Sequence, residues 1–305
     1  MAYFDFFSQK INPKQMLADE PMKNHTSFKT GGPADVLILP QSVPELIAVV
    51  EDCRTLGFPH IVIGNGSNLL FPDEGYGGVV VKTTRLISAG MGCGGCIEAE
   101  AGVTLAALAN TAVSEGLSGL EFASGIPGTL GGAVYMNAGA YGEEIKDVFL
   151  WADVLTDDGI VRMTNEDMKF AYRHSALQHG GRIMLKAALL LKNGDPVEIR
   201  EKMRKLNAER KAKQPLEYPS AGSAFKRPDG YFASKLIMES GLAGFTIGGA
   251  QVSEKHCGFI INRDNATSGD ILRLIAHVRD VVAGKFGVQL EPEVRIVKLE
   301  EKYFA

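Results

Sequence analysis

Two glycine-rich segments are the part of this 305-residue sequence with the clearest potential for chemistry. They read GNGSNLL at Gly64–Leu70 and GIPGTLGGAVYMNAGAYG at Gly125–Gly142. Glycine loses more conformational freedom on folding than other residues, so a cluster of glycines needs a compensating role. One such role is close approach to an anion, because successive backbone N–H groups can form an anion-binding nest. A tight packing loop between lobes is the alternative interpretation of Gly125–Gly142.

The surroundings of the glycines narrow the type of anion. Neither segment contains Lys or Arg, so a phosphate would be held by N–H groups alone, which suits a diphosphate that stays bound. The sequence has no G-x-x-x-x-G-K-[ST] motif, which argues against a P-loop kinase. Gly90, Gly92 and Gly95 match G-x-G-x-x-G, but the strand-like run IEAEA follows them where a Rossmann fold requires a helix. We interpret that match as a turn.

The cysteines do not indicate a metal site or a disulfide framework. Cys93 and Cys96 form a C-x-x-C pair, but no second pair or nearby histidine completes a zinc site. We interpret them as reduced cysteines in a glycine-rich turn and expect no metal. The N-terminal MAYFDFFSQK lacks the features of a signal peptide, so we expect a cytoplasmic protein.

Composition excludes several classes of function. The sequence is 45% hydrophobic, which is enough for two or three domains with buried cores. A net charge of -4 gives no electrostatic reason to expect nucleic acid or an anionic membrane as partner. The uncharged stretch Phe122–Gly142 approaches the length of a membrane span, but six glycines between Gly125 and Gly142 argue against one.

The elements that must position these segments fall into three regions, which we place at residues 1–85, 86–194 and 195–305. In the first region, buried strands alternate with a helix that Ser42 begins and Glu45 completes as a capping box, which indicates an α/β lobe. The second region is interpreted as another α/β lobe, and a charged helix leads from it into the third. The strands expected are Val36–Leu39, His60–Ile63, Val79–Lys82, Ile97–Ala101, Asp147–Leu155, Ile160–Met163, Ile183–Leu191 and Glu293–Leu299. The helices expected start at Ser42 and at Thr104 and cover Asn165–Tyr172, Asp195–Lys213, Phe232–Ser240 and Ser268–Phe286.

Six runs of residues, in order along nearly the whole chain, resemble one known family. They are NHTSFKTGGPAD from Asn24, GNGSNLL from Gly64, GLEFASGIPGTLGGAVYMNAGAYG from Gly119, YRHS from Tyr172, AGSAFKRP from Ala221 and EPEVR from Glu291. The chain resembles the bacterial UDP-N-acetylenolpyruvoylglucosamine reductases, flavoenzymes of peptidoglycan synthesis. This resemblance implies a two-lobed FAD-binding domain of the vanillyl-alcohol-oxidase (PCMH) type, with α+β and α/β character, followed by a C-terminal α+β substrate domain.

The resemblance also implies which residues lie near FAD. Some proteins of this fold attach flavin covalently through a His or Cys, but His25 belongs to the family's own motif and is interpreted as structural, so we expect non-covalent FAD. The implied cofactor residues are Lys29, Thr30, Gly31, Gly64, Asn65, Gly66, Ser67, Asn68, Leu69, Gly125, Pro127, Gly128, Thr129, Gly131, Gly132, Ala133, Asn137, Gly139, Ala140 and Tyr141.

Three catalytic residues follow from the family motifs. The enolpyruvyl double bond is electron-rich, so hydride addition requires stabilisation of the charge that develops next to the carboxylate. The resemblance implies Arg173 as the clamp on that carboxylate, Ser223 as the proton donor and Glu293 as a hydrogen-bonding acid whose protonation state stays open. NADPH is implied as the co-substrate that reduces the flavin. Without the family motifs, a surface ion pair, a turn serine and an exposed strand residue would be the ordinary interpretations of these three.

The resemblance also implies contacts to the substrate. Lys213, Arg227 and His256 occupy positions that resemble the family's contacts to the UDP-sugar, although other members have glutamine in place of His256, and Lys235 is a further candidate. The chain looks like the shorter of the two family types, and we expect a monomer. Two rival functions remain open: a flavin oxidase of the same fold that passes electrons to oxygen, and a non-catalytic nucleotide-binding or sensor protein.

Overall fold

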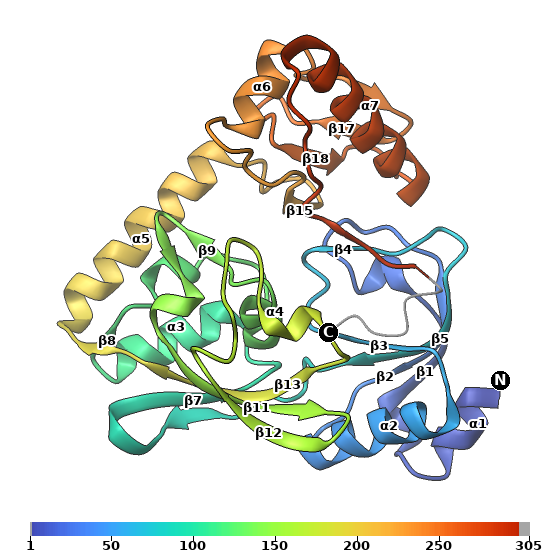
Figure 1. Cartoon of the computed structure of the whole chain (residues 1–305), viewed down its shortest axis with the longest axis vertical. Coiled ribbons are helices and arrows are strands. Elements are labelled where there is room, and N and C mark those ends of the chain that lie inside the picture. Colours follow the sequence, from blue (N-terminus) through green and yellow to red (C-terminus); the bar gives the residue numbers. More distant parts are fainter. Residues whose placement is uncertain (1, 299–305) are drawn as a thin grey trace.

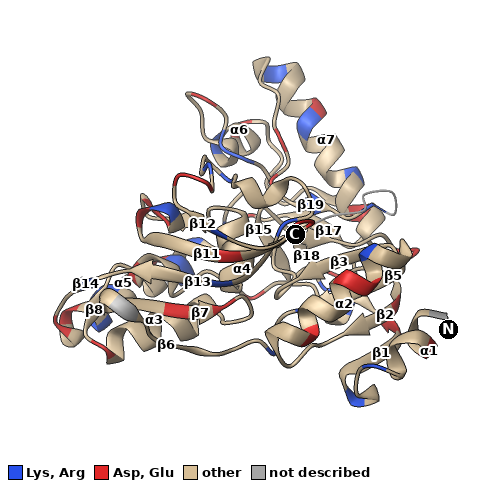
Figure 2. Cartoon of the chain, turned by 60° about the horizontal axis from the view of Figure 1, so that its bottom comes forward, with Lys and Arg blue, Asp and Glu red and all other residues tan. Residues whose placement is uncertain are grey.

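The computed structural model describes residues 2–298 and shows three regions around a common centre. In Figure 1 the N-terminal lobe (lobe 1, blue) and the second lobe (lobe 2, green) lie side by side, and the C-terminal domain (orange and red) lies above them. Charged residues of both signs are interspersed along the helix α7 (Ser268–Phe286) and around the helix α2 (Val43–Leu56) in Figure 2. Among the described residues, no helix combines the length and apolar character that crossing a membrane requires.

Lobe 1 is a four-stranded sheet covered by helices. Its elements are α1 (Ala2–Ser8), β1 (Met16–Pro21), β2 (Pro33–Ile38), α2 (Val43–Leu56), β3 (His60–Ile63), β4 (Leu69–Leu70) and β5 (Tyr76–Lys82). The strand order is β1-β2-β5-β3, in which β2, β5 and β3 are parallel and β1 is antiparallel to β2. The predicted β-α-β alternation is confirmed. The predicted capping box is only partly present. Ser42 caps α2 as predicted, but the Glu45 carboxylate accepts from the Gln41 N–H at 2.8 Å and not from the Ser42 N–H.

Lobe 2 is built on a five-stranded antiparallel sheet. Its main elements are β6 (Ala89–Met91), β7 (Cys96–Glu100), α3 (Leu105–Ser114), α4 (Leu130–Tyr135), β11 (Phe149–Thr156), β12 (Gly159–Thr164) and β13 (Ile183–Leu190). The short strands are β8 (Leu117–Ser118), β9 (Gly139–Ala140), β10 (Glu143–Glu144) and β14 (Lys192–Asn193). The order β12-β11-β13-β7-β6 is antiparallel throughout, so the predicted α/β arrangement of this lobe is wrong and the lobe is α+β.

The helix predicted at Asn165–Tyr172 is also wrong. Residues 165–169 form turns instead. The Asp167 carboxylate accepts from the Thr164 N–H and hydroxyl at 2.8 and 2.7 Å, so a first turn forms. Lys169 then adopts a φ of +49°, which ends the turn because a right-handed helix cannot continue through it.

Helix α5 (Pro196–Lys213) runs from lobe 2 to the C-terminal domain along one side of the molecule (Figure 1). Asp195 begins it as predicted, since its carboxylate accepts from the Val197 N–H at 2.8 Å. The helix buries Ile199 and Met203 in the core of lobe 2 and leaves most of its charged residues exposed. The boundaries at residues 85 and 194 stay predictions, and this packing favours ending lobe 2 after α5.

The C-terminal domain packs two helices on a four-stranded antiparallel sheet of order β15-β18-β17-β16. Its elements are β15 (Ser220–Ser223), α6 (Ala233–Glu239), β16 (Thr246–Ile247), β17 (Ala250–Val252), β18 (Phe259–Asn262), α7 (Ser268–Phe286) and β19 (Arg295–Ile296). The predicted closing strand Glu293–Leu299 is shorter, since only β19 is paired, and Leu299 lies outside the described residues. β19 pairs in parallel with β4 of lobe 1. β19 therefore lies beside the end of the glycine-rich loop at Gly64–Leu70.

Lobe 1 also contacts the C-terminal domain at the start of α7. The Asp73 carboxylate accepts from the backbone N–H groups of Ser268 and Gly269 at 2.7 and 2.8 Å, which satisfies donors that a helix N-terminus leaves open. The Asn262 amide donates to the Phe28 carbonyl at 2.9 Å. These contacts fix the C-terminal domain to lobe 1, so the space between the three regions has a defined shape.

Candidate active site

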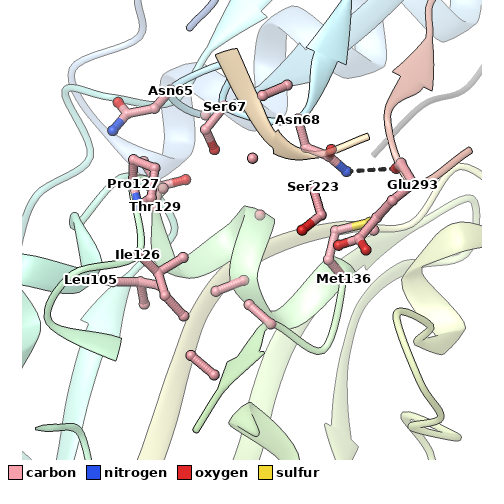
Figure 3. A pocket seen from close by; sticks show the side chains of 18 of the residues that line it. Asn65, Ser67, Asn68, Leu105, Ile126, Pro127, Thr129, Met136, Ser223 and Glu293 are labelled. Atoms are coloured by element: carbon pink, nitrogen blue, oxygen red, sulfur yellow. Dashed lines mark hydrogen bonds between the residues drawn. The ribbon is translucent and has the colours of Figure 1, made fainter. Parts of the chain in front are cut away.

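A cavity of about 460 Å³ lies where the two lobes, the end of α5 and the C-terminal domain meet. Lobe 1 contributes the end of β3 and the loop after it, and lobe 2 contributes the loop before α4 and the segment around β9. The predicted cofactor residues that line the cavity are Gly64, Asn65, Gly66, Ser67, Asn68, Leu69, Pro127, Gly128, Thr129, Gly132, Ala133, Gly139, Ala140 and Tyr141. The two glycine-rich segments, which are some sixty residues apart in the sequence, thus form facing walls of one site (Figure 3).

The glycines on the lobe 1 wall allow close approach of the backbone. Gly66 has a φ of +63°, and a Cβ there would lie 2.1 Å from the His25 carbonyl oxygen. A Cβ on Gly64 would lie 2.1 Å from Oγ1 of Thr129, on the opposite wall. Larger residues would either strain the loop or push the two walls apart. The glycines therefore set the width of the cavity at this end.

Three polar atoms at the cavity wall have no hydrogen-bond partner among the described residues. They are Oγ1 of Thr129, Nε of Arg210 and Oε1 of Gln214, and all three residues line the cavity. Buried polar groups in folded proteins are almost always satisfied, so unpaired ones in a cavity fit a ligand that supplies partners. The cavity therefore has the properties of a site for a large polar ligand with ring systems, because Leu105 and Ile126 add apolar wall beside these groups (Figure 3).

The three residues predicted to be catalytic line the same cavity. Arg173 precedes a buried stretch of lobe 2, Ser223 ends β15, and Glu293 lies just before β19. Nε of Arg173 donates to Oε1 of Glu293 at 2.6 Å, across 120 positions of sequence. Figure 3 shows the Ser223 hydroxyl and the Glu293 carboxylate on one side of the cavity, with Asn65 and Thr129 at the other end. The geometry brings a permanent cation, a hydroxyl and a carboxyl group together.

The electrostatics of this group are set by burial. Burial raises the pKa of Glu293, and the nearby Arg173 and Lys226 oppose that rise. Asn68 fixes the backbone of Glu293, since its amide donates to the Glu293 carbonyl at 3.0 Å (Figure 3). Besides the bond to Glu293, Nη2 of Arg173 donates to the Gly139 carbonyl at 3.4 Å. Among residues 2–298 the remaining three of its five N–H donors have no partner, so the guanidinium can still bind an anion.

Two of the predicted substrate residues line the cavity as well. Lys213 is exposed at the end of α5 and lies 3.5 Å from Glu209 one turn earlier. Burial lowers the pKa of His256, whose Nδ1 accepts from the Gly258 N–H at 3.2 Å. His256 is therefore neutral near pH 7 and can take part in hydrogen bonds but adds no fixed charge.

Other predicted residues do not line the cavity. Asn137 is fully buried and donates to the Ala171 carbonyl at 3.0 Å, so it supports the turn that carries Arg173. Arg227 is exposed and lies over the Phe232 ring at 4.0 Å, and Lys235 pairs with Glu239 at 3.8 Å. The remaining residues of this kind are Lys29, Thr30, Gly31, Gly125 and Gly131. Gly125 and Gly131 are needed for packing, because a Cβ there would lie 2.3 Å from Asn207 and 3.2 Å from Ala101, respectively.

Several cavity residues were not predicted. Glu209 and Arg210 line it together with Lys213 in the last turn of α5, where Glu209 and Lys213 are four positions apart, and Gln214 lines it directly after the helix ends. That spacing was readable around Lys213 in the sequence. Met136 and Arg295 lie inside the motifs GIPGTLGGAVYMNAGAYG and EPEVR but were not singled out, and no such signal marked Phe259, which reaches the cavity through tertiary packing.

Comparisons with known proteins define the class of the site. Residues 34–165 match a family model described as an FAD binding domain. A solved structure of an alkyldihydroxyacetonephosphate synthase matches over 63% of this chain and 41% of the synthase chain, with a TM-score of 0.51. At 17% sequence identity, this match shows a shared fold alone. Together with the facing glycine-rich walls, these findings define an FAD-binding protein with the vanillyl-alcohol-oxidase (PCMH) fold.

Closer relatives define the family. Residues 214–297 match the model of the C-terminal domain of UDP-N-acetylenolpyruvoylglucosamine reductase. The protein of that name from Caldanaerobacter subterraneus subsp. tengcongensis is 52% identical over 96% of this chain and 97% of its own length. The protein of that name from Enterococcus faecalis is 49% identical over 95% of this chain and 96% of its own length. The solved enzyme from Thermus caldophilus is 35% identical over 92% of this chain and 97% of its own, with a TM-score of 0.78. The chain belongs to the UDP-N-acetylenolpyruvoylglucosamine reductase family, which confirms the resemblance and the fold it implied.

Gly66→Ala tests the role of the glycine-rich loop in binding FAD. We expect the Kd for FAD to rise about tenfold or more, because the new Cβ meets the His25 carbonyl and the residue must keep a positive φ, a strain of ~1–3 kcal/mol. Flavin fluorescence titration of the apoprotein measures this Kd. Gly57→Ala is the matched control, since Gly57 has a similar φ of +68°, no atom within 4 Å of its Cβ position and no place in the cavity. Equal Kd values for the two variants would contradict the role of the loop.

Proposed function

We propose that this protein uses NADPH to reduce UDP-N-acetylglucosamine enolpyruvate to UDP-N-acetylmuramate for peptidoglycan synthesis, with non-covalently bound FAD as the intermediate carrier. The observation that carries the proposal is the convergence of Arg173, Ser223 and Glu293 at one end of the cavity between the glycine-rich walls. FAD, when bound, supplies a hydride from its N5 position. The proposed enzyme works in the cytoplasm, where NADPH is available. It works as a monomer, since one chain supplies every group named.

The residues of the chain would act on the enolpyruvyl group in a defined order. The free N–H donors of Arg173 hold the substrate carboxylate, which is a geometry that a guanidinium satisfies bidentately. A hydride forms the new C–H bond at the terminal carbon, and the displaced electron pair moves to the carbon that bears the carboxylate. Glu293 in its neutral form donates a hydrogen bond to the developing enolate oxygen. Ser223 then gives its hydroxyl proton to the carbon, which completes the addition of H⁻ and H⁺.

The rest of the cavity would hold the two ligands. We propose that the loops Gly64–Leu69 and Pro127–Thr129 hold FAD, where the unpaired Oγ1 of Thr129 finds a partner. Lys213 and His256, at the mouth formed by α5 and the C-terminal domain, would contact the UDP-sugar. Lys213 supplies positive charge for a phosphate. Arg227 and Lys235 lie outside the cavity and would reach the substrate only after a rearrangement.

Two half-reactions test the proposal directly. In stopped-flow experiments, NADPH should bleach the flavin absorbance, and UDP-N-acetylglucosamine enolpyruvate should restore it without oxygen. Restoration by air at a comparable rate, with no response to the enolpyruvyl substrate, would show an oxidase instead. A purified protein without flavin absorbance that gains none on addition of FAD would contradict catalysis through flavin altogether.

The raised pKa of Glu293 leads to a prediction on pH. An acid with a raised pKa stays neutral to higher pH, so reoxidation by the enolpyruvyl substrate should be fast below that pKa and should slow as pH rises through it. Glu293→Gln keeps the position neutral at every pH, so this decline should vanish whatever the plateau rate is.

Two controls make the pH measurement specific. Flavin reduction by NADPH, followed over the same pH range, reports ionisations unrelated to the substrate step. Glu291→Gln removes a carboxylate two positions away that pairs with Lys226 and lies outside the main cavity, so it should keep the decline. The same decline in Glu293→Gln and the wild type would exclude Glu293 as its origin.

A further inference from the structure

The Gln178 side chain makes three hydrogen bonds to nitrogen or oxygen atoms beside the Arg173–Glu293 pair, and its Nε2 also donates to Sδ of Met136 at 3.9 Å. Its Nε2 donates to the carbonyls of Tyr135 and Arg173 at 2.9 and 3.0 Å, and its Oε1 accepts from Nη1 of Arg295 at 3.4 Å. It does not line the main cavity, but it lines a second cavity of about 470 Å³ that shares Arg173, Glu293 and Arg295 with the first. One amide therefore joins the end of α4, the turn that carries Arg173 and the strand β19.

Arg173 depends on such support because its backbone is strained. Its φ is +54°, a left-handed conformation that residues with a Cβ adopt only when surrounding contacts hold it. The turn around it is closed by reciprocal bonds of 3.1 Å between Ala171 and His174, and Asn137 holds the Ala171 carbonyl. These contacts fix the two ends of the turn. The carbonyl of Arg173 itself is held by Gln178.

The three bonds of Gln178 are not equivalent. The Tyr135 carbonyl also accepts from the Ser175 hydroxyl at 2.9 Å, so it would stay satisfied without Gln178. Among the described residues the Arg173 carbonyl accepts from no donor other than Gln178. Loss of the Gln178 amide would therefore act first on Arg173, whose guanidinium must keep its direction toward Glu293 and the cavity.

We propose that Gln178 is a positioning residue, which holds Arg173 in the left-handed conformation from which its guanidinium clamps the substrate carboxylate. The proposal rests on the function proposed above for Arg173. Gln178 also donates to the Tyr135 carbonyl and to Sδ of Met136, which both line the main cavity, so unchanged FAD binding in a Gln178 variant is needed to assign its effect to Arg173. A displacement of about 1 Å at a positioned group can slow a reaction by up to ~10²-fold, which makes this effect measurable.

Gln178→Met tests the proposal, because methionine has a similar length and no amide. We expect FAD retention and flavin reduction by NADPH to match the wild type, and reoxidation by UDP-N-acetylglucosamine enolpyruvate to slow by about tenfold. Gln251→Met is the matched control, since Gln251 also donates to a backbone carbonyl, that of Gly244 at 3.1 Å, and lines neither cavity. It should reoxidise at the wild-type rate.

A double-mutant cycle with Arg173→Lys separates positioning from an independent role. If Gln178 acts through Arg173, the double variant should reoxidise no more slowly than Arg173→Lys alone, because the guanidinium that Gln178 positions is already absent. Wild-type reoxidation in Gln178→Met, or losses that multiply in the double variant, would overturn the proposal. A wild-type rate for Arg173→Lys itself would overturn the role assigned to Arg173 and this inference with it. If Gln178→Met does not fold, Gln178→Asn, one methylene shorter, takes its place in the same cycle.

Discussion

Ser223→Ala should give a yellow protein that NADPH still bleaches but that the enolpyruvyl substrate reoxidises ~10²-fold or more slowly, the usual effect of losing a general acid. The structure gives the reason for this separation. Ser223 lies at the end of β15 on the same side of the cavity as Glu293, whereas Asn65 and Thr129 lie at the other end. Removal of the Ser223 hydroxyl removes the proposed proton donor next to Glu293 and leaves the glycine-rich walls intact. Anaerobic stopped-flow absorbance of each half-reaction measures the effect.

Ser220→Ala is the control for this experiment. Ser220 lies three positions earlier on the same strand and outside the cavity, so its loss tests the strand without touching the site. Both half-reactions of this variant should proceed at the wild-type rate. A Ser223→Ala protein that is reoxidised as fast as the wild type would remove Ser223 from the mechanism and leave another group to deliver the proton.

Local sequence signals predicted the elements that need no tertiary information. Helix α7 has the predicted bounds Ser268–Phe286, and strand β3 has the bounds His60–Ile63, because caps and apolar runs define both. The antiparallel order of the lobe 2 sheet was not predictable in this way, since strand direction depends on which segments pair. The helix expected at Asn165–Tyr172 failed for a local reason, namely that Lys169 leaves the helical conformation after one turn.

The site required more than local signals. The glycine-rich segments alone indicated an anion cradle, and the family motifs indicated FAD and the residues Arg173, Ser223 and Glu293. No sequence spacing predicts that Nε of Arg173 lies 2.6 Å from Glu293, or that Arg210 and Gln214, which line the cavity, each carry a buried polar atom without a partner among the described residues. These contacts join segments from different regions of the chain. Conversely, Asn137 lies within the glycine-rich segment but supports the Arg173 turn from a buried position, which sequence order cannot distinguish from cofactor contact.

Arg173→Lys should slow reoxidation by the enolpyruvyl substrate by ~10²-fold or more, because a point charge cannot replace a bidentate fork that is also hydrogen-bonded to its neighbours. The guanidinium of Arg173 has two tasks in the structure. One N–H donates to Glu293 and another to the Gly139 carbonyl, which leaves three donors for the carboxylate. An ammonium group has three donors in total, so a lysine that kept both protein contacts would have one donor left and could not hold the carboxylate bidentately. FAD binding and reduction by NADPH should change little.

The result for Arg173→Lys also depends on its partner Glu293. If lysine leaves the buried carboxyl with weaker stabilisation of its charge, the pKa of Glu293 should rise further, and the decline of the reoxidation rate should move to higher pH. Arg182→Lys is the matched control, since Arg182 donates to the Ala176 carbonyl at 3.1 Å in the same lobe and lies outside both cavities. Near-wild-type reoxidation in Arg173→Lys, with the pH profile unmoved, would show that the carboxylate is held elsewhere, and Arg295, which lines both cavities, would be the next cation to replace.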